Sequence, residues 1–239
     1  EQSQLALRNG KAVLCEKPIT TLPDQFLELK TLALSKNLYL MEGMWMYFLP
    51  AIQKAQQWIA EGKLGKIRSI KADFGYNVHI DAEDTIYNQK LAVELLLDKR
   101  IYPIAIATLL LGSRPKTINV TSRKAETGVD SDVVAVLDYN KSSAILHASF
   151  ESQIRNTTQI IGEEGTIEIP DFWGAKSCTV IKGKDVVEHF VDQSSGRGFN
   201  HEIQAVTDDL LAGKKESQVV SYSVSEQLQT LLSEVSSHF

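Results

Sequence analysis

The sequence is poor in several features that mark particular protein classes. Cysteine is rare: Cys15 and Cys178 lie far apart in 239 residues, a usage typical of a reducing compartment and not of a disulfide-stapled secreted domain. Long apolar runs are also missing, since stretches such as residues 104–111 are far shorter than the roughly 20 residues of a membrane-spanning helix. We therefore expect a cytoplasmic protein with no membrane partner.

Blocks of like charge and clusters of metal-binding residues are missing too. The formal net charge is −5, from 25 Lys and Arg against 30 Asp and Glu, and the basic residues are scattered. Nucleic-acid-binding proteins usually carry a basic patch, so we expect no nucleic-acid partner. The five histidines have none of the close His or Cys spacing of metal sites, so we expect no metal.

The chain also lacks the G-x-G-x-x-G turn that receives the phosphates of a dinucleotide. Its nearest candidate, Gly-Glu-Glu-Gly at residues 162–165, lies between two β-branched runs, residues 158–161 and 166–169. This pattern predicts a hairpin turn, and its two carboxylates would repel a phosphate.

What the first residues do contain is the end of a βα repeat. Residues 1–9 predict a helix ended by Gly10, and a short buried strand follows at residues 12–15. A further helix begins at Pro23, and residues 38–41 predict another strand. We therefore interpret residues 1–42 as the C-terminal remnant of a Rossmann-like domain, and we expect the chain to start in mid-domain.

The remaining residues, 43–239, predict a second domain in which strands outnumber helices. The predicted helices are residues 50–61, 91–111, 199–211 and 221–236, and the predicted strands are residues 67–74, 117–123, 133–139, 143–151, 158–161, 166–169, 178–182 and 186–191. The fold class is thus α/β and α+β: a Rossmann-like remnant followed by an α+β domain with an open, largely antiparallel sheet, helices on one face.

Two of the predicted strands are more apolar than a sheet with one wet face requires. Residues 133–137 and 144–148 are almost continuously apolar. An uncovered sheet face of this kind favours pairing with a second copy. We therefore expect a homodimer formed through the sheet face.

The triplet Glu16-Lys17-Pro18 follows the strand at residues 12–15 directly. A lone lysine after a strand is most often solvated surface. Ligands of open α/β sheets, however, bind at the carboxyl ends of strands, and a proline fixes the path of the chain there. A lysine held at such a place can hydrogen-bond a hydroxyl or lower its pKa.

Asp98 and Tyr102 are four residues apart at the start of an apolar helix, so they share one helix face. From spacing alone, the simpler interpretation is a helix cap by Asp98 and a core tyrosine at position 102. Aromatic residues gather at two other places, at the domain junction and after the predicted hairpin, where they either pack the core or line a pocket. They are Trp45, Phe48, Phe172 and Trp173.

Taken in order along the chain, these segments resemble the glucose-fructose oxidoreductase, inositol dehydrogenase and rhizopine-catabolism (Gfo/Idh/MocA) family, in particular its branch of dimeric dihydrodiol dehydrogenases and NADP-dependent xylose dehydrogenases. The resemblance implies hydride transfer between NADP or NAD and a sugar, polyol or vicinal diol. It implies cofactor contacts by Glu16, Lys17 and Pro18, a proton-exchanging Tyr102 oriented by Asp98 and activated by Lys17, and a substrate pocket lined by Trp45, Phe48, Phe172 and Trp173.

Four residues at three places depart from the family pattern. Arg100 replaces a usual glycine, Val93-Glu94 stands where a glycine pair is common, and Tyr47 occupies a position that is usually arginine in the branch. An alternative interpretation is therefore a non-catalytic ligand-binding or regulatory relative, in which Arg100 blocks the nicotinamide.

We expect the 239-residue chain, taken alone, to bind a dinucleotide weakly or not at all and to be inactive. The reason is that the phosphate-binding turn supplies most contacts to such a cofactor. Isothermal titration calorimetry with NADP and NAD measures this, and micromolar binding would show that the anion site lies elsewhere.

Overall fold

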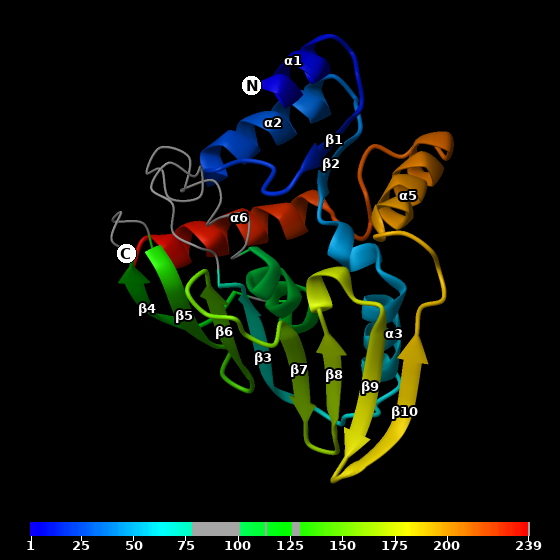
Figure 1. Ribbon diagram of the computed structural model, residues 1–239. Coiled ribbons are helices and arrows are strands. Elements are labelled where there is room, and N and C mark those ends of the chain that lie inside the picture. Colours follow the sequence, from blue (N-terminus) through cyan, green and yellow to red (C-terminus); the bar gives the residue numbers. More distant parts are fainter. Residues whose placement is uncertain (78–100, 113, 126–129, 239) are drawn as a thin grey trace.

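The computed structural model describes residues 1–77, 101–112, 114–125 and 130–238 (Figure 1). The chain forms a small α/β unit that lies above one large sheet in Figure 1. Helices cover one face of this sheet. The predicted fold class is confirmed: a Rossmann-like fragment precedes an α+β domain with an open, largely antiparallel sheet. The boundary at residues 42 and 43 stays a prediction, and residues 91–100 of a predicted helix lie outside the described residues.

The small unit holds two parallel strands and two helices. Gly10 ends the first helix with φ of +74°, a conformation that glycine adopts easily. Pro23 occupies the first turn of the second helix, where its missing N–H costs nothing. The four elements are α1 (Gln2–Arg8), β1 (Val13–Glu16), α2 (Pro23–Ser35) and β2 (Leu40–Gly43), with β1 paired to β2.

The last helix of the chain, α6 (Tyr222–Ser236), returns to this unit. Ser221 caps it by accepting a hydrogen bond from the backbone N–H of Val224. Tyr222 joins Phe26 and Leu40 in the hydrophobic core of the small unit. The end of the chain therefore helps to bury its beginning.

The large sheet has eight strands in the order β10-β9-β8-β7-β3-β6-β5-β4. Neighbours are antiparallel apart from β3 and β6, which run parallel. The strands are β3 (Ile67–Gly75), β4 (Thr117–Lys124), β5 (Asp130–Asp138), β6 (Ser143–Ser149), β7 (Thr157–Gly162), β8 (Thr166–Pro170), β9 (Ser177–Lys182) and β10 (Asp185–Val191).

Side chains alternate across this sheet as the sequence predicted. Ile70 and Leu146 lie on the buried face, while Lys71 and Ile145 are exposed on the other. The helices α3 (Pro50–Ala60) and α6 and the helical residues 101–111 cover the buried face (Figure 1). The opposite face is left open by the described residues.

Two short 3-10 helices were not predicted, and β2 begins two residues later than expected. The 3-10 helices are η1 (Trp45–Phe48) and η2 (Phe172–Gly174). Such turns have no characteristic period, and all residues of η1 are buried, so packing decides their shape. Within the described ranges, no helix is both long and apolar enough to cross a membrane.

Candidate functional site

The ammonium group of Lys17 lies over an aromatic ring. Lys17 follows β1 directly, is only 9% exposed, and its Nζ is 4.5 Å from the centroid of the Tyr102 ring. A cation at this distance is attracted by the negative face of the ring. The two residues, 85 positions apart in the sequence, are thus brought together at the junction of the small unit and the large sheet.

The hydroxyl group of Tyr102 is held by a second residue. Trp45 Nε1 donates a hydrogen bond to it over 2.9 Å, with both side chains buried. Because an indole N–H can only donate, the phenol oxygen is the acceptor.

Further aromatic rings enclose Tyr102. Phe74, at the end of β3, stacks on it with ring centroids 5.6 Å apart. Trp173 of η2 contacts Tyr102 at 6.4 Å and Trp45 at 6.3 Å. Trp45 in turn stacks at 4.5 Å on Phe199, the first residue of helix α5 (Phe199–Leu211). Together these rings form an apolar wall around one phenol and one ammonium group.

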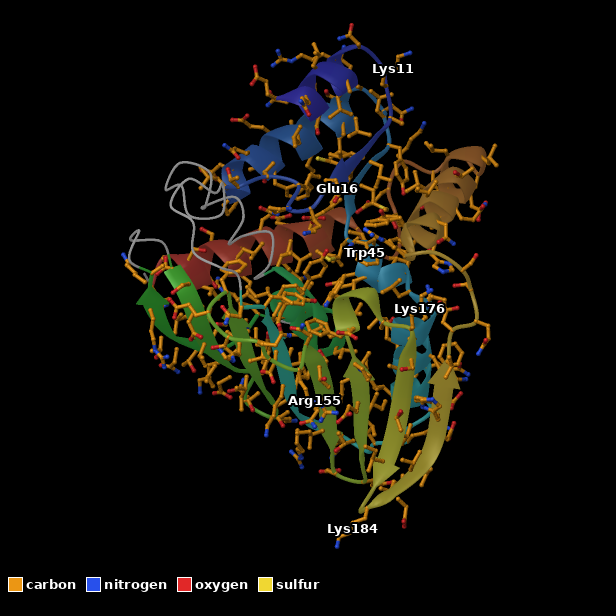
Figure 2. All side chains as sticks on the ribbon, viewed as in Figure 1. Lys11, Glu16, Trp45, Arg155, Lys176 and Lys184 are labelled. Carbon is orange, nitrogen blue, oxygen red and sulfur yellow. The ribbon has the colours of Figure 1, made fainter. Side chains whose placement is uncertain are left out.

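Gly198 permits the close approach of α5 to this wall. Its φ is +106°, and an added Cβ would lie 2.4 Å from Leu49 Cδ2 and 3.4 Å from the Trp45 ring. A larger residue would push α5 away from Trp45. Figure 2 shows Trp45 between the small unit and the large sheet, with Glu16 on the small unit above it in this view.

A cavity of about 810 Å³ lies beside Lys17 at the carboxyl end of β1. Its size lies in the usual range for small-molecule sites. Its polar side chains can donate and accept hydrogen bonds, and Glu1 and Glu28 add two carboxylates to the lining. The polar lining residues are Ser3, Gln4, Thr20, Thr21 and Gln25.

The structure brings together four of the residues predicted for the site: Lys17, Tyr102, Trp45 and Trp173. Phe48 and Phe172 are buried in the hydrophobic core at 4% and 0% exposure. Pro18 lines the cavity and Glu16 is exposed. Asp98 and Arg100 lie outside the described residues. The roles of all these residues stay predictions.

Sequence reasoning missed Phe74, Tyr76 and Phe199 as members of the aromatic wall. Tyr76 contacts Phe74 edge to face at 5.5 Å. Phe74 ends an alternating strand and Phe199 begins an amphipathic helix, so both looked like core residues. The one available signal was that each ends or begins an element beside the domain junction.

Two family descriptions match the chain. Residues 52–168 match the GFO/IDH/MocA C-terminal domain, and residues 1–44 match the oxidoreductase family with an NAD-binding Rossmann fold. The chain belongs to the GFO/IDH/MocA oxidoreductase family. The predicted resemblance is confirmed, and the cofactor is NADP or NAD because the family's first domain binds that dinucleotide.

Relatives of this GFO/IDH/MocA chain are dehydrogenases. It is 31% identical over 238 residues to trans-1,2-dihydrobenzene-1,2-diol dehydrogenase of Xenopus laevis, a match covering 96% of this chain and 72% of that protein. The enzyme of the same name from Homo sapiens is 33% identical over 243 residues, covering 97% and 71%.

Solved structures of other oxidoreductases share the fold. An aldose-aldose oxidoreductase from Caulobacter crescentus, complexed with glycerol, superposes with a TM-score of 0.87 at 19% identity, over 99% of this chain and 72% of that one. A 3-ketoreductase from Actinomadura kijaniata, in complex with NADP and TDP-benzene, superposes with a TM-score of 0.84 at 26% identity, over 99% and 73%.

In this GFO/IDH/MocA chain a buried carboxyl also faces the end of β1. Glu202, on the first turn of α5, is 4% exposed. Burial first, and the charge of Glu16 second, raise the pKa of its carboxyl from 4.5 to about 7. The folded state therefore prefers this group protonated.

This preference predicts a pH dependence of stability. Because the folded pKa is raised, the stability from a protonated Glu202 is full below about pH 4.5 and is lost as the pH rises to about 7. Urea unfolding should show that the free energy of unfolding of Glu202→Gln rises relative to that of the unaltered chain across this pH range, by about 3 kcal/mol in total. Asp208→Asn, an exposed change on the same helix, should show no such gain. A constant difference for Glu202→Gln would contradict the assignment.

Proposed function

We propose that this protein transfers a hydride between NADP or NAD and a sugar, polyol or vicinal diol, oxidising a CH–OH group to a carbonyl group or, in the reverse direction, reducing that carbonyl. The observation that carries the proposal is the position of Lys17. It lines the cavity at the end of β1, and its ammonium lies over the ring of Tyr102. One lysine can therefore contact both a nicotinamide in the cavity and a substrate oxygen beside the phenol.

The nicotinamide ring, when bound, supplies the hydride acceptor or donor. In the direction of oxidation, the substrate hydroxyl gives its proton to the Tyr102 oxygen while its carbon gives up the hydride. The Trp45 N–H and the Lys17 ammonium favour the phenolate that accepts this proton. In the reverse direction Tyr102 returns the proton to the oxygen. Orientation of this pair by Asp98 is part of the proposal.

The aromatic wall supports the choice of substrate class. Trp45, Phe74 and Trp173 pack their rings around the ring of Tyr102. Such rings pack well against the C–H faces of a sugar or a cyclic diol, while Lys17 and Tyr102 address its hydroxyls. The relatives named for a dihydrodiol substrate point the same way. Phe48 and Phe172 would support this wall from the core.

We place the protein in the cytoplasm as part of this proposal. Both Cys15 and Cys178 are free thiols in the structure. Burial raises the pKa of the Cys178 thiol to about 12, so it is a poor nucleophile for disulfide exchange. Unbridged thiols suit a reducing compartment, where an NADP- or NAD-dependent dehydrogenase also finds its cofactor.

The catalytic pair is tested by removing its polar groups in a form of the protein that carries a complete dinucleotide-binding domain. Tyr102→Phe and Lys17→Met should each lower the rate of hydride transfer by roughly 10²–10⁴-fold, the usual range for a positioned acid or base. The double variant should lose much less than the product of the two, because the groups act as one unit. Stopped-flow absorbance at the nicotinamide band measures these rates.

Tyr47→Phe is the matched control, because Tyr47 is a buried tyrosine whose hydroxyl donates to the Ala105 carbonyl and lies outside the proposed pair. It should keep the full rate. If Tyr102→Phe also kept most of its activity, Tyr102 would be a core residue and the proposed chemistry would be wrong.

We further propose that two copies pair through the open face of the large sheet. Val136 and Ile145 are neighbours in register on this face and are 38% and 37% exposed. Lys71 lies next to Ile145 on the other side, and His147 pairs with Asp132 over 3.2 Å. An apolar centre with a polar surround is the usual composition of an interface between two copies.

The dimer is tested by placing charges in that centre. A Val136→Lys, Ile145→Lys variant should sediment as a monomer at micromolar concentration, because like charges of two copies would meet across a symmetric interface. Val187→Lys, on an exposed position of the edge strand β10, is the matched control and should stay dimeric. Sedimentation of the unaltered protein as a monomer at high micromolar concentration would contradict the proposal.

A further inference from the structure

Glu42 is a buried carboxylic acid directly beneath the turn that carries Lys17. It lies on β2 and is 1% exposed. Its Oε1 accepts the backbone N–H of Ile19 over 3.0 Å. Ile19 is two residues after Lys17, so this hydrogen bond fixes the path of the chain just beyond the lysine.

The same carboxyl group also joins this turn to the last helix. Gln229 of α6 donates its Nε2–H to Glu42 Oε1 over 3.4 Å. The side-chain oxygen of Gln229 accepts the hydroxyl of Thr20 over 3.3 Å, which lies on the same turn. Glu42 and Gln229 thus hold three segments together: β2, the turn at residues 17–20, and α6.

Electrostatics adds a second link to the lysine. Burial raises the pKa of the Glu42 carboxyl above its ordinary value, while the hydrogen bonds to it and the positive charge of Lys17 act in the opposite direction. A buried carboxyl is costly, and an apolar residue of similar size would often be as stable. Stability alone therefore gives little reason for a glutamate here, whereas control of the lysine turn gives one.

We propose that Glu42 is a positioning residue for the hydride-transfer site: by anchoring the turn at residues 17–20 to α6, it holds the Lys17 ammonium over the ring of Tyr102. It acts through the lysine and touches no reacting atom. The effect of Glu42 on catalysis, as distinct from its effect on the position of Lys17, rests on the proposed function. The placement of the lysine can nevertheless be measured without any turnover.

The first experiment measures the protection of Lys17 in the 239-residue chain. Trinitrobenzenesulfonate reacts with accessible amines, and peptide mass spectrometry follows the modification of Lys17 alone. Glu42→Met keeps the length of the side chain but removes the acceptor, so Lys17 should react about tenfold faster, as expected when one hydrogen bond to a charged group is lost from a local closed state. Glu42→Gln keeps an acceptor for Ile19 and should stay within about twofold of the unaltered chain.

Asp209→Asn is the matched control. Asp209 is also a buried carboxylate on a C-terminal helix, and it accepts hydrogen bonds from Tyr39 and Lys214. Loss of the Asp209 carboxylate should leave Lys17 protected from trinitrobenzenesulfonate. Equal protection of Lys17 in Glu42→Met and in the unaltered chain would overturn the inference.

If Glu42→Met does not fold, Gln229→Ala takes its place, because it removes only the α6 side of the anchor. It should also speed the modification of Lys17, and unchanged protection in this variant would overturn the inference as well.

The second experiment separates positioning from bulk stability in a form of the protein that carries a complete dinucleotide-binding domain. Glu42→Met should lower kcat about 10-fold to 100-fold while the KM for the dinucleotide changes little, and Glu42→Gln should recover most of the loss. Unchanged kcat in Glu42→Met would contradict positioning. If Tyr102→Phe removes activity but Glu42→Met leaves Lys17 protected, only the positioning inference fails. If Glu42→Met exposes Lys17 but Tyr102→Phe stays active, the proposed function fails instead.

Discussion

The structure of this site depends on keeping the ammonium group of Lys17 away from bulk water and in a fixed position. Removing a lysine from water is expensive unless other groups replace its hydration. Here the face of Tyr102 lies 4.5 Å from the Lys17 ammonium, and the carboxyl of Glu42 interacts with it electrostatically from below. Three segments serve this arrangement: the turn after β1, the first residue of η1 and the end of β3. Each contributes a group that contacts the lysine, the phenol or the residues that support them.

Much of the fold could be predicted from local patterns in the sequence. Helix α5 was predicted with its observed bounds, and α3, β3 and α6 were predicted to within one residue. In these segments the signals were clear: a proline at the start of a helix, the period of an amphipathic helix, or alternation of apolar and polar residues. Lys17 could be singled out because it follows the end of a strand, whereas spacing alone made Tyr102 a core residue and only the family resemblance marked it for the site.

The contacts between these residues could not be predicted in the same way. The hydrogen bond from Trp45 to Tyr102 exists because a 3-10 helix turns the indole toward residue 102, and such turns leave no period in the sequence. Glu42 looked like part of an apolar block at the domain junction, since its partners Ile19 and Gln229 come from distant segments. The parallel pairing of β3 with β6 is likewise a matter of tertiary arrangement.

The return of α6 to the small unit has a consequence for the order in which the protein matures. Glu42 meets its helix partner Gln229 across 187 residues of sequence, and Tyr222 fills the core between α2 and β2. During synthesis the lysine turn leaves the ribosome well before the helix that anchors it. A nascent protein therefore carries an unfinished site until α6 has been made, and a protease that removes α6 would release the turn without touching Lys17 or Tyr102.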